Sequence, residues 1–173
     1  TKEIFLSKRE ENKNMSSVDL DKIVNSIIKY ADLQNNREKS YNFDIAKFSE
    51  VSGKTGPYIL YSALRIRKIL TTNTFNKGNV SDTIYNDIDK NLRLKLLDFN
   101  KYLDKAIEDR LPSVIAEYVY DLANLLNSFY QNINISKIED ETMKNDYLNI
   151  LDLSFNVLKE CLDLLIIELP SEM

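Results

Sequence analysis

A stripe of apolar residues near the end of the chain constrains the fold more than any other feature of the sequence. The stripe recurs at alternating steps of three and four residues, and its members are Leu148, Leu151, Phe155, Leu158, Leu162, Leu165 and Leu169. Because an α-helix completes a turn every 3.6 residues, this spacing places all of them on one side of a helix. We expect a seam of the hydrophobic core, with a coiled-coil contact to a partner helix as the minor alternative.

The rest of the chain also favours helices. Its 173 residues include only three Gly and three Pro, too few to separate many short strands. Apolar residues at helical spacing predict helices over about 17–30, 57–71, 83–109 and 112–130, the third of them bent, and a short helical turn at 45–51. Ser16-x-x-Asp19 is typical of a helix start, and we expect Ser136-x-x-Glu139 to begin the last helix. The predicted fold is all-α, a helical bundle of about five main helices over residues 16–173, preceded by a charged linker at 1–15.

The stretch "VSGKTGPYILYSALRIRKIL", residues 51–70, first suggests a phosphate-binding loop. Gly53-Lys54-Thr55 matches the end of the P-loop pattern G-x-x-x-x-G-K-[ST], but Phe48 occupies the place of the first glycine. A second interpretation fits better: the two glycines form a sharp turn, and Pro57 takes the first helical position, where its missing N–H costs nothing. We therefore interpret the stretch as a loop that begins a helix.

That helix has two different faces. Its apolar stripe consists of Ile59, Ala63, Ile66 and Leu70. A roughly opposite face carries two tyrosines and two cations, Tyr58, Tyr61, Arg65 and Lys68. Tyrosine rings stack on unpaired bases, and guanidinium groups bind bases or phosphates, so this face suits a single-stranded nucleic-acid loop. On spacing alone, the tyrosines could equally pack under a neighbouring helix while the cations are merely solvated.

Composition argues against catalysis within these residues. The chain has no histidine, so imidazole catalysis, a Ser-His triad and the common zinc sites are not available in it. We predict no catalytic residue and no metal site. Cys161 lies in an apolar helical pattern and is expected in the core. A net charge of −4 argues mildly against indiscriminate nucleic-acid binding, and the longest late apolar run, "LDLLIIEL", is too short to span a membrane. We expect a soluble, cytoplasmic protein without a membrane partner.

Four segments resemble the anticodon-binding domain of arginyl-tRNA synthetases. The family segment K-Y-A-D-L-x-x-x-R is matched by Lys29, Tyr30, Ala31, Asp32, Leu33 and Arg37. The family segment G-N-T-x-P-Y-x-x-Y-x-x-x-R is matched by Gly53, Thr55, Pro57, Tyr58, Tyr61 and Arg65. "LPSVIAEYVYDLANLLNSFYQN" and "LKECLDLLIIELPSEM" are similar to the family's proline-started helix and to its final L-L-G-I-x-x-P-E-R-M segment. The resemblance spans residues 29–173 in order.

The chain departs from the family pattern at a few positions. Lys54 replaces the family's Asn, Ile166 replaces Gly, and the ending P-E-R-M has become Pro170-Ser171-Glu172-Met173, which reverses one charge. Farther upstream, Ser7, Lys8 and Arg9 faintly resemble the K-M-S-K-R loop with which class I synthetases hold ATP phosphates. The alternative for these three residues is a solvated charged tail.

The resemblance implies recognition without chemistry. The parent enzyme would join arginine to its tRNA using ATP and Mg²⁺, in a catalytic domain that is missing from this chain, and this part would need no cofactor. The bundle would hold the anticodon stem and loop, with Tyr61 and Arg65 at the centre of the contact and Tyr58 and Lys68 beside them. The resemblance adds Tyr130 by stacking and Met173, the last residue of the sequence, by apolar contact, although Tyr130 could instead be a core residue at a helix end.

The expected partners are an arginine-specific tRNA and the parent's catalytic domain, and we expect a monomer. Lys29 and Arg37 are expected to serve internal hydrogen bonds and surface charge. Two alternatives stay open: the anticodon-binding domain of another class I aminoacyl-tRNA synthetase, and a helical protein-interaction module that uses its acidic surface or the stripe of its last helix. The salt dependence of binding separates RNA binding from protein docking, because phosphate contacts weaken steeply as salt rises whereas apolar docking does not.

Overall fold

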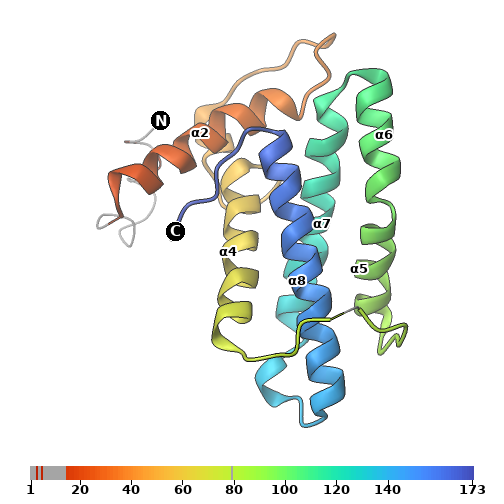
Figure 1. Cartoon of the computed structure of the whole chain (residues 1–173). Helices are drawn as coiled ribbons and strands as arrows, with labels where there is room; N and C mark the ends of the chain where they lie inside the picture. The colour runs from red at the N-terminus through yellow and green to blue at the C-terminus, as the bar shows by residue number, and fades with distance from the viewer. Residues whose placement is uncertain (1–2, 4, 6–14, 79) are drawn as a thin grey trace.

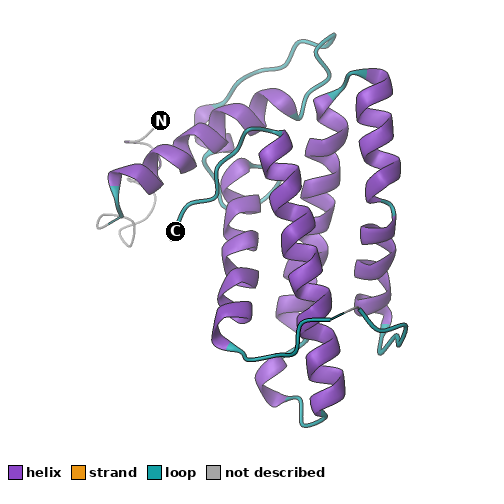
Figure 2. Cartoon of the chain, viewed as in Figure 1, coloured by secondary structure: helices purple, strands orange, loops and turns teal. Residues whose placement is uncertain are grey.

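The computed structural model describes residues 3, 5, 15–78 and 80–173, which form helices joined by loops, with no strand among them (Figure 2). The main elements are α2 (Ser17–Leu33), α3 (Ile45–Phe48), α4 (Gly56–Thr72), α5 (Asp87–Leu97), α6 (Phe99–Asp109), α7 (Pro112–Asn132), a 3-10 turn (Ile135–Lys137) and α8 (Glu141–Leu164). The predicted all-α bundle is confirmed, and the expected bend in the third helical region is the break between α5 and α6 at Asp98.

The long helices form a bundle that α2 crosses at one end (Figure 1). In this bundle α7 occupies the central place, because it packs against α2, α4, α5, α6 and α8. Helix α4 lies against α2, α7 and α8, so one of its sides is covered by three neighbours. The other side of α4 is therefore the one that can carry a binding surface.

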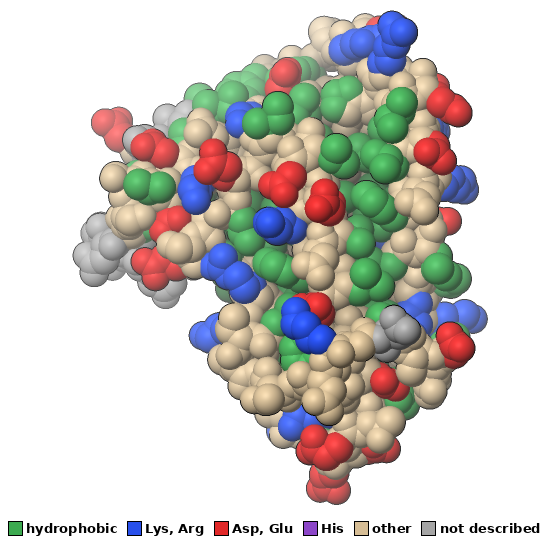
Figure 3. Space-filling view, in the orientation of Figure 1, with side chains coloured by type: hydrophobic (Ala, Val, Ile, Leu, Met, Phe, Trp, Pro, Cys, Tyr) green, Lys and Arg blue, Asp and Glu red, His purple; other side chains and the backbone are tan. Residues whose placement is uncertain are grey.

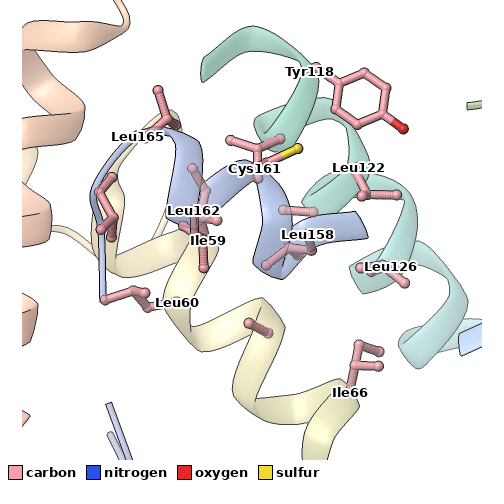
Figure 4. Packing of buried hydrophobic residues seen from close by; sticks show 14 of the residues in the cluster. Ile59, Leu60, Ile66, Tyr118, Leu122, Leu126, Leu158, Cys161, Leu162 and Leu165 are labelled. Carbon is pink, nitrogen blue, oxygen red and sulfur yellow. The ribbon is translucent and has the colours of Figure 1, made fainter. Parts of the chain in front are cut away.

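The core forms where α4, α7 and α8 meet (Figure 4). Leu158 and Leu162 of α8 lie there with Leu122 and Leu126 of α7, all of them at most 1 % exposed. The stripe at the end of the sequence is thus a core seam, as expected, with Phe155 and Leu169 only partly buried against it. The prediction that the whole stripe lies on one helix was wrong at its end, because α8 ends at Leu164 and Leu165 and Leu169 follow it. Cys161 is buried in the same seam, and this burial raises the pKa of its thiol to about 12.

The start of α8 differs from the prediction. The helix begins at Glu141, and the Asp140 carboxylate caps it by accepting hydrogen bonds from the Thr142 and Met143 backbone N–H groups at 2.9 and 3.1 Å. Ser136 lies in the preceding 3-10 turn instead, so the proposed Ser136-x-x-Glu139 cap was wrong. Asp140 is as good a cap as Ser136, and spacing alone did not distinguish them. At α2 the predicted cap is confirmed, because the Asp19 N–H donates to Ser16 Oγ at 3.1 Å.

The beginning of the chain also departs from expectation. Glu3 and Phe5 are helical, where a loop was expected, and Phe5 is 1 % exposed within the core. Ser7, Lys8 and Arg9 lie outside the described residues. The linker boundary at residue 15 stays a prediction.

After α8 the chain turns and runs back along α2 toward α4 (Figure 1). We call residues 165–173 the final segment. Its turn places Ile166 at a φ of 56°, in the left-handed region, and the Ile167 N–H donates to the Leu162 carbonyl at 2.8 Å. A β-branched residue in this conformation is strained, and a glycine, as in the family pattern that this segment resembles, would adopt it without strain. The turn directs the final segment to the outward side of α4.

Candidate nucleic-acid interface

The loop before α4 is shaped by two glycines with different roles. Gly53 has a φ of 72°, which favours glycine. Gly56 needs no unusual φ, but a Cβ there would lie 2.4 Å from the Ser26 carbonyl oxygen, so only glycine permits this close approach of α4 to α2. Thr55 caps the helix by accepting a hydrogen bond from the Tyr58 N–H at 3.2 Å. The helix begins at Gly56, one residue before the predicted start at Pro57.

The outward side of α4 carries a cation between two aromatic rings. The Arg65 guanidinium carbon lies 4.2 Å from the ring centroid of Tyr61, one turn earlier, and 4.8 Å from that of Tyr130, at the end of α7. Arg65 Nη2 also donates to the Tyr61 hydroxyl at 3.0 Å. Tyr130 is 44 % exposed, so its ring remains accessible. We call Tyr61, Arg65 and Tyr130 the arginine cluster.

A polar chain beneath the cluster orients Arg65. Its Nη1 donates to Asn127 Oδ1 at 3.3 Å, and Asn127 Nδ2 donates to Ser62 Oγ at 2.6 Å. Ser62 in turn donates to the Tyr58 carbonyl at 2.7 Å, within the backbone of α4. Both Ser62 and Asn127 are buried. The guanidinium plane is therefore fixed by the fold before any ligand arrives, which lowers the entropic cost of binding.

A pocket of about 480 Å³ opens beside the arginine cluster. Its lining includes all three cluster residues, four other side chains of α4, among them Arg67 and Lys68, and Ser171, Glu172 and Met173 at the end of the final segment. The cations Arg65, Arg67 and Lys68 face a single side-chain carboxylate, that of Glu172, among the lining residues. The pocket is positive although the whole chain is acidic, so it favours an anionic ligand.

The structure brings together five of the six predicted contact residues. Tyr61, Arg65, Lys68, Tyr130 and Met173 all line this pocket, and Lys68 is exposed. Tyr58 is not among its lining residues.

Tyr58 is instead half-buried against α7. Its hydroxyl donates to Asn124 Oδ1 at 2.7 Å, and its ring lies 5.8 Å from that of Tyr120. Tyr58 therefore packs under a neighbouring helix, α7, which is the alternative given above for the tyrosines of α4.

Arg67 is a lining residue that the sequence did not reveal. Its side chain reaches the pocket because its Nη2 donates to the Ser171 carbonyl of the final segment. No pattern within α4 indicates this contact, because it depends on the path of residues 165–173. Lys29 and Arg37 do serve internal hydrogen bonds: they donate to the carbonyls of Ile166 and Arg110, the second at 3.4 Å.

A second hollow, of about 520 Å³, is mostly apolar and lies between α5 and α8. Leu94, Leu97 and Leu153 line it with exposed fractions of 51 %, 79 % and 42 %. Figure 3 shows hydrophobic side chains gathered on this side of the molecule. This hollow bears on the alternative of a protein-interaction module.

The described residues lack two features that other functions would need. In that part of the chain, no group of three or more His, Cys, Asp or Glu side chains could hold a metal ion. Within the same residues, no helix is both long and apolar enough to cross a membrane.

Comparison with known proteins assigns the family. A family model described as the DALR anticodon binding domain matches residues 59–173. The arginine–tRNA ligase of Alkaliphilus oremlandii is 36 % identical over 179 residues, which cover 99 % of this chain and 30 % of that protein. The arginine–tRNA ligase of Agathobacter rectalis is 36 % identical over 176 residues, which cover 96 % of this chain and 30 % of that protein. The chain thus spans about 30 % of the length of these relatives.

Solved structures agree with this assignment. The arginyl-tRNA synthetase of Thermus thermophilus matches with a TM-score of 0.86 at 23 % identity, over 99 % of this chain and 30 % of that one. The arginyl-tRNA synthetase of Plasmodium falciparum matches with a TM-score of 0.81 at 28 % identity, over 99 % of this chain and 31 % of that one. The match over residues 59–173 and the relatives that cover nearly the whole chain lead to one conclusion: this chain belongs to the DALR anticodon-binding domain family.

Proposed function

We propose that this chain is the anticodon-binding part of an arginine–tRNA ligase and that the arginine cluster contacts the unpaired bases of an anticodon loop. The observation that carries the proposal is the Arg65 guanidinium held between the rings of Tyr61 and Tyr130 beside a positive pocket. Family membership supports the same ligand class. In this proposal the protein is a cytoplasmic monomer that holds the tRNA while a separate catalytic domain attaches arginine.

The cluster suits an unpaired base for physical reasons. An exposed ring such as Tyr130 offers a face on which a base can stack, a contact worth about 1–3 kcal/mol per base. The fixed guanidinium of Arg65 presents donors to a base edge or a phosphate. Lys68 and Arg67 supply positive charge for the backbone of the loop, while Met173 gives an apolar edge to the pocket. These residues perform recognition and bind no reacting atoms.

The described residues do not fit ATP or Mg²⁺. The Gly53-Lys54-Thr55 turn lacks the first glycine of a phosphate-binding loop, and the described carboxylates form no metal-binding group. In the proposal both ligands belong to the catalytic part of the enzyme.

The test is a titration of the chain with a panel of tRNA anticodon stem-loops at low salt, followed by fluorescence anisotropy. We expect the stem-loop of an arginine tRNA to bind most tightly and its log affinity to fall linearly with log salt. Equal affinity across the panel would contradict arginine specificity. Tightest binding of a stem-loop from another tRNA would favour a different class I synthetase.

A matched pair of charge variants tests whether the RNA binds at the pocket beside the arginine cluster. Lys68→Gln should make the slope of log affinity against log salt shallower by about 0.7–0.9, the share of one phosphate contact. Lys105→Gln removes the same charge from an exposed position on α6, which packs mainly against α7, and should leave the slope unchanged. Equal effects of the two variants would mean that the protein's overall charge, and not this pocket, attracts the RNA.

The apolar hollow between α5 and α8 supports the second candidate, a helical protein-interaction module. Docking of an apolar helix there would bury Leu97 and Leu94 and would depend little on salt. A chain that binds no stem-loop at any salt concentration would leave this second candidate as the better one.

A further inference from the structure

The final segment is held against α2 by a series of polar contacts along one side of that helix. Lys29 donates to the Ile166 carbonyl, Lys22 donates to the Leu169 carbonyl at 3.4 Å, and Asp19 accepts two hydrogen bonds from Ser171. The segment therefore runs antiparallel to α2. Positions 19 and 29 lie about 15 Å apart along a helix, and the five steps from residue 166 to residue 171 cover about 17 Å in an extended chain. The two lengths match, so the segment lies nearly extended on the helix.

Ser171 is the most tightly held residue of the segment. Its backbone N–H donates to Asp19 Oδ1 at 2.6 Å, and its hydroxyl donates to Asp19 Oδ2. Its carbonyl accepts a hydrogen bond from Arg67 of α4. Every polar group of Ser171 is thus engaged, and the residue links α2 to α4. Two residues later, Met173 lines the pocket beside the arginine cluster.

The Asp19 carboxylate is buried and accepts hydrogen bonds from both Ser16 and Ser171. It is only 3 % exposed, although a buried carboxylate is costly unless it is well hydrogen-bonded. Ser16 Oγ also donates to Asp19 Oδ2, at 3.0 Å. The hydroxyl of Ser171, more than any other group, holds the pKa of Asp19 below its ordinary value, so the carboxylate is charged at neutral pH.

We propose that Asp19 is a positioning residue for the RNA site: through Ser171 it fixes the final segment so that Met173 forms one wall of the pocket. This inference rests on the proposed function. Asp19 itself is not among the residues that line the pocket, so it acts through the segment. Its role is also unusual for a carboxylate near an RNA surface, since its charge alone would repel phosphate.

Because Asp19 is negatively charged, electrostatics and positioning predict opposite effects of its removal on stem-loop binding. Asp19→Ala removes one negative charge, so electrostatics alone would tighten stem-loop binding. The proposal expects the opposite: binding weakened about tenfold, as a hydrogen bond to a charged group is lost and the wall of the pocket loosens. Ser171→Ala should weaken binding in the same direction, and Ser171→Thr, which keeps the hydroxyl, should restore it.

Two further measurements separate positioning from general destabilisation. Ser16→Ala removes the cap of α2 but leaves both Asp19–Ser171 bonds, so it should lower stability without weakening RNA binding. Hydrogen exchange of the backbone amides at 167–173 should accelerate in Asp19→Ala and Ser171→Ala while the amides of α7 stay protected.

Two results would overturn the inference. One is tighter or unchanged stem-loop binding by Asp19→Ala in spite of faster exchange in the final segment. The other is unchanged exchange there, which would mean that Asp19 does not hold the segment. If the wild-type chain binds no stem-loop, the proposed function fails together with the RNA part of this inference, and exchange still decides whether Asp19 holds the final segment.

Discussion

Two clusters of tyrosines and charged side chains in this molecule use the same residue types in opposite ways. The first is the arginine cluster. The second, which we call the aspartate cluster, consists of Tyr85, Asp146 and Tyr147 together with Asn86, Asp89 and Arg93. In the aspartate cluster the Tyr85 hydroxyl donates to Asp146 at 2.6 Å, and Asn86 donates to the Tyr147 hydroxyl at 2.8 Å.

The difference lies in what each cluster leaves accessible. Tyr147 and Asp89 are both 0 % exposed, and Arg93 Nε pairs with Asp89 at 2.8 Å, so the aspartate cluster is a buried part of the fold, although Arg93 Nη2 has no hydrogen-bond partner among the described residues. The arginine cluster keeps the Tyr130 ring 44 % exposed beside a pocket with three cations. Aromatic and charged residues in proximity do not by themselves mark a binding site. Accessible ring faces and an excess of one charge do.

The largest expected effect comes from breaking the ion pair of the aspartate cluster. Asp89→Ala leaves the mostly buried Arg93 without its carboxylate partner, and we expect the free energy of unfolding to fall by about 3–5 kcal/mol. Urea unfolding followed by circular dichroism measures it. The folded fraction should bind the stem-loop as the wild type does. A loss below about 1 kcal/mol would show that this cluster is not structural.

The next largest effect concerns the arginine cluster. Tyr61→Ala removes a stacking surface worth about 1–3 kcal/mol and should weaken stem-loop binding about tenfold or more, with little change in stability. Tyr61→Phe keeps the ring and should bind nearly normally. Anisotropy titration and urea unfolding of the same samples give both quantities.

A core variant of the same helix is the control for that prediction. Ile66→Ala, at a position that is 1 % exposed, should lose about 2–5 kcal/mol of stability. If Tyr61→Ala proves equally destabilising and its folded form binds the stem-loop normally, Tyr61 belongs to the fold, and the contrast between the clusters disappears.

The smallest effect depends on pH and concerns Tyr85. Its hydrogen bond to Asp146, more than its burial, raises its pKa to about 12. Tyr85→Phe should cost about 1 kcal/mol at neutral pH, because Asp146 still accepts a hydrogen bond from Ser81. A pKa raised in the folded state stabilises the fold below pH 10, and this contribution is lost as pH rises from 10 through about 12. Urea unfolding at pH 8 and pH 11 should therefore show a smaller difference between variant and wild type at pH 11. A constant difference would contradict the assigned cause.

Local periodicity predicted those parts of the molecule that depend on a single helix. The proximity of Tyr61 and Arg65 follows from their four-residue spacing, and the burial of Ile59 and Ile66 follows from the opposite stripe. Tyr130 and Met173 came only from resemblance, since no spacing rule joins the end of α7 or the final segment to α4. That they line one pocket with Tyr61 is a finding about geometry, and their contact with RNA stays a prediction.

The features that sequence reasoning missed depend on loops and on long-range paths. Arg67 and Asp19 meet through Ser171, although positions 19 and 171 are 152 residues apart. The aspartate cluster forms because Ser81 and Tyr85, in the loop before α5, both reach Asp146 of α8. The start of α8 was misplaced for a local reason, because Ser136 and Asp140 are both good capping residues and their spacing alone does not show which one begins the helix.

The close approach of α2 and α4 limits how the sequence can change. A methyl group at position 56 would lie 2.4 Å from the backbone oxygen of Ser26 and 2.6 Å from its carbonyl carbon. Those atoms belong to the backbone of α2, so even alanine forces the two helices apart. Gly78, with nothing within 4 Å of such a group, carries no comparable restriction. Because α2 holds the final segment and α4 carries Tyr61 and Arg65, the distance between these two surfaces depends on the missing Cβ of Gly56.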